Sequence, residues 1–155
     1  KSWEDILVSR VGHIICYSAK GMPGQSMDKV TLLKDLGIEG DYHATGGDRQ
    51  VTLISQKAKG WMRAKEVPGF CFAKFKENIV VEDLLLEGLP EEGQLVVGEA
   101  LLQLTPTRKT CYEKYCTLVH EKEVCKLIQE VRFARVKAGG VITVGMEIIV
   151  KETSP

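Results

Sequence analysis

A reactive cysteine is the strongest chemical feature of this sequence. Cys111 follows Arg108, Lys109 and Thr110, and Cys116 lies five residues further on. Positive neighbours favour the thiolate over the thiol, and the thiolate is the form that attacks electrophiles, carries sulfur or binds soft metals. Cys116 could resolve a bond formed at Cys111 or carry the chemistry itself. The sequence therefore predicts a catalytic, metal-binding cysteine at Cys111 or Cys116 and does not choose between them.

Three other interpretations of this segment stay open. Cysteines outside disulfides are often small buried residues, so both could simply lie in the core. A structural zinc site is a second interpretation, because four suitable ligands have the spacing C-x4-C-x3-H-x4-C. These ligands are Cys111, Cys116, His120 and Cys125. A reversible disulfide between Cys111 and Cys116 would make a thiol redox protein, although the C-x-x-C spacing is absent.

A second group of polar residues occupies the glycine-rich stretch from 37 to 50. It contains Glu39, Asp41, His43, Asp48 and Arg49. Glycines let backbone N–H groups approach an anion, and Arg49 is suited to clamp a phosphate or carboxylate with two hydrogen bonds. No Gly-Lys-Ser/Thr is present, so nucleotide hydrolysis by a P-loop is not supported. The alternative is a structural turn whose charges cap one another, and spacing alone does not separate the two.

Composition narrows the class of protein. The 155 residues contain 21 Lys and Arg and 21 Asp and Glu, so the formal net charge is zero. This length fits a single domain over 1–155 with its core over about 10–150. The charge balance argues against nucleic acid or anionic membrane as a partner. We expect a cytoplasmic protein, because five cysteines cannot all pair and neither a secretory leader nor a membrane-length apolar run is evident.

Short β-branched segments bounded by turn residues predict a mainly β protein. The predicted strands are 10–18, 50–55, 78–82, 94–97, 100–105, 132–137 and 141–151. A helix is expected over 56–66, because Ser55 can cap its start and Pro68-Gly69 ends it, and a second over 121–130. The stretches 93–102 and 140–149 both read as strand, glycine, strand, a pattern typical of barrel corners. We therefore predict a closed or nearly closed β-barrel with one or two short helices.

Three blocks of the sequence resemble the MOSC domain, named for the C-terminal region of molybdenum-cofactor sulfurase. The first block is GIEGDYHA at 37–44 with DRQV at 48–51. The second is FKENI at 75–79 with GLP at 88–90 and GEA at 98–100. The third is RKTC at 108–111 with Cys116, FARV at 133–136 and GVITVG at 140–145. The blocks occur in the family's order over roughly residues 10–150, and the resemblance is greatest to short stand-alone bacterial members.

The resemblance implies a β-barrel of the pyruvate-kinase barrel type with an essential cysteine, here Cys111 or Cys116. Relatives bind molybdenum cofactor or handle sulfur. Some reduce N-hydroxylated compounds with electron-donor partners, and in those the cysteine thiolate is a molybdenum ligand. The candidate contacts for the cofactor's phosphate and pterin are Arg49, Lys109 and Arg135, with Asp48 and Asn78 as polar positioners. Asp41 and His43 complete the set of cofactor-binding candidates.

The implied function is a molybdenum-cofactor-binding or sulfur-carrier protein that acts through a cysteine. Its expected partners are an electron-donor or sulfur-donor protein and molybdenum-cofactor enzymes. Short relatives commonly have a histidine after the first cysteine, where this chain has Tyr112, and the gap to Cys116 is one residue longer. The alternative is a non-enzymatic binding module, either a zinc-stabilised barrel or an accessory domain in cofactor biosynthesis.

Overall fold

Short strands make up most of the regular structure. The computed structural model describes residues 8–65, 69, 71–72, 75–111, 116 and 125–151. The strands in these residues are β1 (Arg10–Cys16), β2 (Gln25–Met27), β3 (Lys29–Leu33), β4 (Gly37–Ile38), β5 (Val51–Ser55), β6 (Ile79–Glu82), β7 (Gln94–Val97), β8 (Ala100–Leu104), β9 (Val131–Ala138), β10 (Gly140–Thr143) and β11 (Ile149–Lys151). The helices are α1 (Gln56–Ala64) and α3 (Lys126–Glu130).

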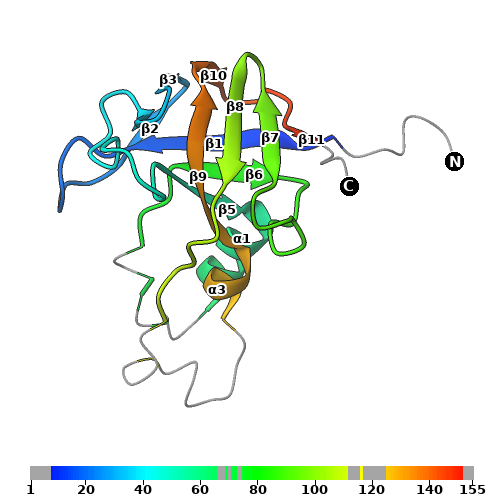
Figure 1. Cartoon of the computed structure of the whole chain (residues 1–155). Helices are drawn as coiled ribbons and strands as arrows, with labels where there is room; N and C mark the ends of the chain where they lie inside the picture. The colour runs from blue at the N-terminus through cyan, green and yellow to red at the C-terminus, as the bar shows by residue number, and fades with distance from the viewer. Residues whose placement is uncertain are drawn as a thin grey trace, which may run out of the picture.

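Eight of the strands form one strongly curled sheet in the order β11-β7-β8-β9-β5-β6-β1-β2. Figure 1 shows the curl, with β7, β8 and β9 running across the direction of β1 and β6. The β5–β6 pair is parallel, and the other pairs are antiparallel. A smaller sheet has the order β10-β3-β4. The prediction of a mainly β fold is therefore confirmed.

The curled sheet is open among the described strands, so it is a half-barrel rather than the closed form of the predicted barrel. Its edges are β11 and β2. Gly145, whose φ is +91°, breaks the predicted strand 141–151 into β10 and β11, so no single strand closes the curl. β10 leaves to pair with β3, while β11 pairs with β7. The turn between them lies against β1, where the Val11 N–H donates to the Met146 carbonyl at 2.9 Å.

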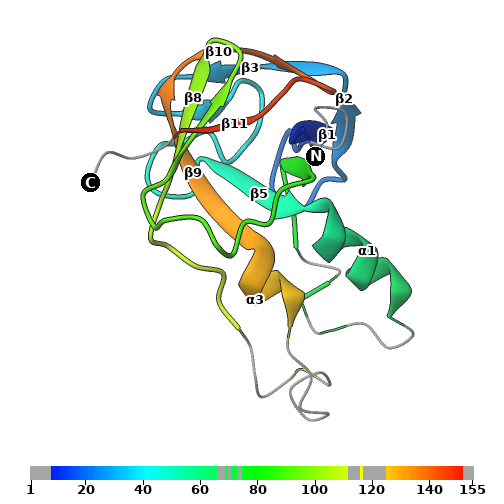
Figure 2. The same cartoon turned by 90° about the vertical axis from the view of Figure 1, so that its right-hand side faces the viewer.

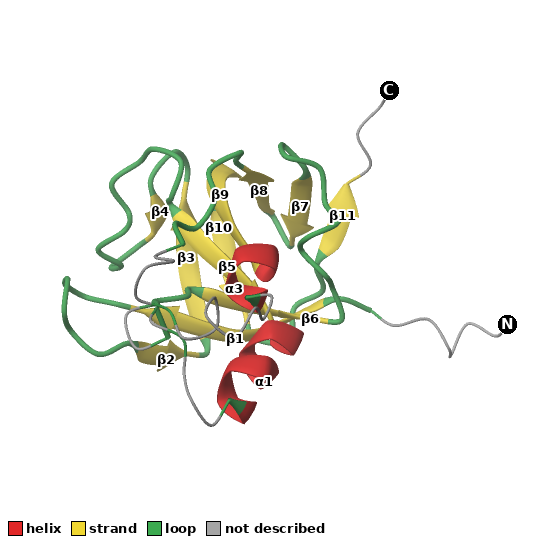
Figure 3. Cartoon of the chain, turned by 90° about the horizontal axis from the view of Figure 1, so that it is seen from below, coloured by secondary structure: helices red, strands yellow, loops and turns green. Residues whose placement is uncertain are grey.

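The helices cover one outer face of the sheet. The Ser55 Oγ accepts a hydrogen bond from the Ala58 N–H at 3.2 Å, so α1 begins at the predicted cap. Of the predicted helix 121–130, α3 covers the last five residues, and 121–124 lie outside the described residues. Figure 2 shows α1 and α3 beside each other below β5 and β9, and in Figure 3, seen from below, they lie in front of the sheet. Within the described residues, no helix is long and apolar enough to cross a membrane.

Two apolar cores result from this arrangement. The larger fills the inside of the curl, with Ile14, Leu53 and Leu102 among its fully buried members. The smaller lies between the outer face of the sheet and the helices and includes Leu127 and Phe133. Alternation along β9 therefore sends even-numbered side chains into the curl and odd-numbered ones to the outer face. This outer face carries the polar surface described below.

Two buried charged residues at the junction of α3 and β9 hold the loop 86–91. The Glu130 carboxylate accepts the N–H groups of Leu86 at 2.8 Å and Glu87 at 2.9 Å. The Arg132 guanidinium, whose residue is only 1% exposed, donates to four carbonyls of the same loop. These are the carbonyls of Leu86 at 3.1 Å, Leu89 at 3.0 Å, Pro90 at 2.9 Å and Glu91 at 3.3 Å. Each buried charge is thus compensated by backbone dipoles.

Candidate functional site

Asp48 joins three segments that are far apart in the sequence. Its carboxylate accepts hydrogen bonds from the Arg135 guanidinium on β9, from Nε at 2.9 Å and from Nη2 as well. Thr107 Oγ1, in the segment 105–111 that follows β8, donates to the same carboxylate at 3.1 Å. The hydrogen bonds from Arg135 and Thr107 lower the pKa of the Asp48 carboxyl, so it is ionised at neutral pH. The structure thus brings together two predicted site residues, Asp48 and Arg135.

Arg49 provides a second guanidinium on the same surface. It lies over the Phe133 ring with 4.7 Å between guanidinium carbon and ring centroid, a cation–π contact, and its Nη2 donates to the Arg108 carbonyl at 3.5 Å. Phe133 and Arg135 are two residues apart on β9, so their side chains share the outer face. Both Arg49 and Arg135 are exposed. We call Arg49, Arg108, Lys109 and Arg135 the basic surface; guanidinium groups of this kind bind phosphate or carboxylate.

The two candidate cysteines have different surroundings. Cys111 is exposed at the end of the segment that Thr107 ties to Asp48, whereas Cys116 is buried, with 7% of its surface exposed. Lys109, two residues before Cys111, is half-buried, and its Nζ donates to the Thr110 carbonyl at 3.1 Å. Burial and the charge of Asp41 raise the pKa of a third thiol, that of Cys16. An incoming reactant can therefore reach Cys111 more readily than Cys116 or Cys16.

The predicted zinc set is only partly within the described residues. His120 lies outside them, and Cys125 is half-buried against the smaller core. Within the parts of the chain that the structure describes, no group of three or more His, Cys, Asp or Glu side chains is placed to hold a metal ion.

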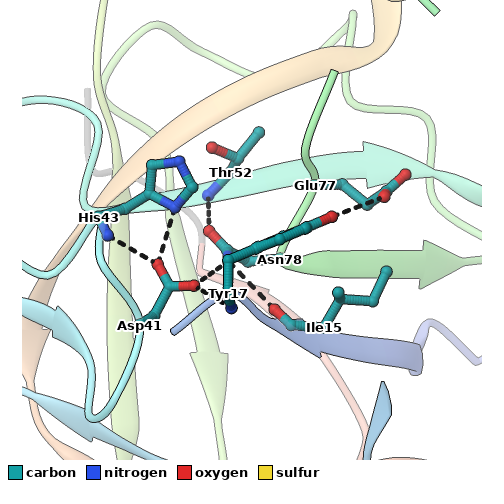
Figure 4. A network of polar contacts seen from close by, with 7 residues as sticks. All are labelled: Ile15, Tyr17, Asp41, His43, Thr52, Glu77 and Asn78. Carbon is teal, nitrogen blue, oxygen red and sulfur yellow. Dashed lines mark hydrogen bonds and ion pairs between the residues drawn. The ribbon is translucent and has the colours of Figure 1, made fainter. Parts of the chain in front are cut away.

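Asp41 and Asn78 form a second, interior cluster, shown in Figure 4. The Asp41 Oδ1 accepts the Tyr17 N–H at 2.8 Å and Asn78 Nδ2 at 3.3 Å. The same Nδ2 donates to the Ile15 carbonyl at 3.1 Å, and the Asn78 Oδ1 accepts the Thr52 N–H at 3.0 Å. Asp41 and Asn78 are both buried. Their described contacts are therefore with the protein itself, joining the loop 37–50 to β1, β5 and β6.

His43 lies at the edge of this interior cluster. Its Nδ1 is 2.8 Å from Asp41 Oδ2, and its backbone N–H donates to the same oxygen at 3.0 Å. Burial alone would raise the pKa of the Asp41 carboxyl. The hydrogen bonds from the His43 side chain and from the backbone of Tyr17 and His43 outweigh that effect and lower it. Asp41 is consequently a buried carboxylate that is ionised at neutral pH.

A short chain of contacts links the interior cluster to the basic surface. Asn78 bonds the backbone of Thr52 in both directions, at 3.0 Å and 2.9 Å. Thr52 is the register partner of Phe133 in the β5–β9 pair, so their side chains share a face of the sheet. The Phe133 ring in turn makes the cation–π contact with the Arg49 guanidinium. Within the loop 37–50, Asp41 is thus connected through Asn78 to β5, and Arg49 contacts Phe133 on the adjacent strand β9.

Three contributors to the site were not singled out from the sequence. Thr107 bonds the Asp48 side chain, Thr105 Oγ1 donates to the Asp48 carbonyl at 3.1 Å, and Phe133 supports Arg49. The alternation of Phe133 and Arg135 within a predicted strand is a signal that could have placed them on one face. For the threonines no such signal exists, because their partner is 57 to 59 residues away.

Comparison with known proteins confirms the family resemblance. The sequence matches the family model of the MOSC domain over residues 40–149. A search of curated proteins finds no match. Among solved structures, the YUAD protein from Bacillus subtilis is 18% identical, with a TM-score of 0.67 over 92% of this chain and 94% of that one. YiiM from Geobacillus stearothermophilus is 19% identical, with a TM-score of 0.64 over 93% and 75% of the two chains. YiiM from Escherichia coli is 18% identical, with a TM-score of 0.57 over 94% of this chain and 71% of that one.

Proposed function

The chain belongs to the MOSC domain family, and from this premise we propose that it binds a molybdenum cofactor or carries sulfur through the thiolate of Cys111. The observation that carries the proposal is an exposed thiol at the end of a segment that is fixed beside two guanidinium groups. Thr107 and the Arg108 carbonyl hold that segment to Asp48 and Arg49. Cys116 is the weaker candidate, because it is buried.

The side chains of the basic surface fit a phosphate-bearing cofactor. Arg49 is held by a ring and by one carbonyl, contacts that leave N–H donors for an anion. Arg135 is oriented by Asp48, and its side chain is 48% exposed. In this proposal Arg49, Lys109 and Arg135 hold the phosphate and Cys111 binds the metal or the transferred sulfur. When bound, such a cofactor supplies a redox-active metal centre, and a reductase reaction would also need electrons from a separate donor protein.

Metal and sulfur content of the purified protein test the proposal. Protein isolated without reductant is analysed for molybdenum and by intact mass for a persulfide, before and after exposure to molybdenum cofactor or a sulfur donor. We expect uptake of one of them by the wild type and by Cys116→Ser, and its loss in Cys111→Ser. Full uptake by Cys111→Ser would refute the assignment. Stoichiometric zinc without either group would instead favour the zinc-stabilised binding module.

A further inference from the structure

The pair formed by Asp41 and His43 has a geometry that the proposed cofactor contacts do not use. We propose that His43 accepts a proton, at Nε2, from a ligand bound at the basic surface, and that Asp41 is its positioning residue. The ligand class is an anion that also carries an acidic N–H, O–H or S–H group. The identity of that ligand rests on the proposed function, whereas the state of the imidazole rests on the contacts of His43 alone.

The tautomer of His43 follows from the charge of Asp41. An ionised carboxylate only accepts hydrogen bonds, so the imidazole nitrogen 2.8 Å from Asp41 Oδ2 must be the donor. Nδ1 therefore carries the hydrogen, and in the neutral ring Nε2 carries the lone pair. No hydrogen bond of the described residues engages Nε2, and the side chain is 20% exposed. His43 thus presents a proton-accepting nitrogen that a ligand can reach.

The ring is also fixed in orientation from two sides. The Tyr42 ring lies against it with 4.0 Å between centroids, and the Tyr17 ring meets it edge-on at 6.1 Å. Burial is the main cause that raises the pKa of both tyrosines, so both are uncharged at neutral pH. Behind Tyr17, Glu77 accepts from its hydroxyl at 3.4 Å and Lys76 lies 5.0 Å from its ring centroid. Asp41 is therefore the charged group in direct contact with the imidazole.

The proposed transfer balances locally. A proton leaves the ligand's acidic group for the Nε2 lone pair, and the imidazolium that forms is stabilised by the Asp41 carboxylate. The ligand gains one negative charge, which Arg49 and Arg135 stabilise. The imidazolium later releases the proton to water. Contacts through Asn78, Thr52 and Phe133 connect Asp41, the partner of His43, with Arg49 across the adjacent strands β5 and β9.

A purely structural pair is the competing explanation, in which Asp41 only caps the turn that follows it. Asp41 already accepts three hydrogen bonds without the imidazole, from the N–H groups of Tyr17 and His43 and from Asn78. Turn capping therefore does not require an imidazole at position 43. Both explanations place the hydrogen on Nδ1. The structural one makes no requirement on access to Nε2 or on a reaction there, which is how the two explanations differ.

Nitrogen NMR of the cofactor-free protein tests the tautomer directly. The chain contains only His13, His43 and His120, so labelled histidine gives three sets of signals, and His43→Gln identifies the relevant one. In a spectrum of the neutral ring, recorded at alkaline pH, we expect the hydrogen on Nδ1. A hydrogen on Nε2 would overturn the proposal. This test uses the spectrum of the wild-type protein, so it can be done even if Asp41→Asn proves too unstable to study.

Acylation by diethyl pyrocarbonate tests the reactivity and the location of Nε2. We expect His43 to react faster than His13, whose Nε2 bonds the Ser26 hydroxyl at 2.7 Å. Inorganic pyrophosphate, used as the anion probe, should slow the reaction at His43 and leave His13 unchanged. An unreactive His43, or no protection by pyrophosphate, would overturn the assignment. Neither readout uses molybdenum, sulfur or Cys111, so failure of the proposed chemistry at Cys111 would leave these results unchanged.

Discussion

Replacing Asp41 by asparagine should destabilise the fold strongly. The carboxylate accepts four hydrogen bonds, two at each oxygen. An amide keeps one accepting oxygen and turns an NH₂ group toward the donors at the other position. Two charge-assisted hydrogen bonds are then lost, at about 1.5 kcal/mol or more each, so we expect a loss of about 3 kcal/mol in the free energy of unfolding. For a chain of this size, that corresponds to a fall of roughly 6–12 °C in melting temperature.

Thermal and urea denaturation of the wild type, Asp41→Asn and Asp48→Asn provide the comparison. Asp48 is a matched control, because it is an aspartate of the same loop whose hydrogen-bonded carboxylate is 39% exposed. Water replaces the partners of an exposed carboxylate, so Asp48→Asn should change the melting temperature little. The reasoning fails if Asp41→Asn is no less stable than Asp48→Asn. In that case the buried carboxylate would not be the anchor of the loop.

Three other outcomes are expected. The lowered pKa of Asp41 means that the folded chain binds this proton less tightly than the unfolded chain. The stability that the Asp41 carboxylate contributes is therefore present above its ordinary pKa of 3.8 and is lost as the pH falls toward the pKa of the folded state. In urea unfolding between pH 6 and 3, the wild type should lose more free energy of unfolding than Asp41→Asn. Arg132→Met should lower the free energy of unfolding by about 3 kcal/mol in the same assay, because four carbonyls of the loop 86–91 lose their hydrogen-bond donor. An unchanged urea midpoint would contradict this. Gly37→Ala should lower the free energy of unfolding by about 2 kcal/mol or more, because φ is +140° and the added Cβ would lie 2.8 Å from the Gln50 carbonyl oxygen. Gly88→Ala is the control: an added Cβ meets nothing within 4 Å there, so the free energy of unfolding should hardly change.

The strands of the curled sheet could largely be predicted from local sequence. Apolar, mostly β-branched residues and bounding turns mark β5, β6 and β7 to within a residue, leucines between turns mark β8 equally well, and Ser55 marks the start of α1. These signals act within a few residues of the element that they define. β2 and β4 carry no comparable signal, because they have only three and two residues and contain exposed polar residues or a glycine. β3, with the sequence KVTLL, has the β-branched pattern but is missing from the predicted strands. The pairing of these strands with β1 and β10 depends on contacts that no local pattern contains.

The functional residues show the same limit. The sequence indicated an anion-binding loop from the residue types at Asp41, His43, Asp48 and Arg49. Their spacing did not separate buried from exposed positions. Asp41 is buried because Tyr17 and Asn78, 24 and 37 residues away, provide its donors. Arg135, 87 residues from Asp48, keeps that second aspartate at the surface. The pattern of charged residues thus predicted an anion-binding loop. Hydrogen bonds to distant residues decided which of its two aspartates, Asp41 or Asp48, is buried.

Two exposed guanidiniums of the basic surface, those of Arg49 and Arg135, differ in the charge that they offer to a ligand. Arg135 is paired with the ionised carboxylate of Asp48, so the pair is close to neutral as seen by an approaching anion. Arg49 is held by an aromatic ring and a carbonyl, which are uncharged, and it keeps its full positive charge. An anion that binds here gains more from Arg49 than from Arg135, whose N–H groups it must share with Asp48. Because Arg49 also contacts the Arg108 carbonyl, an anion held by Arg49 would lie beside the segment that ends in Cys111.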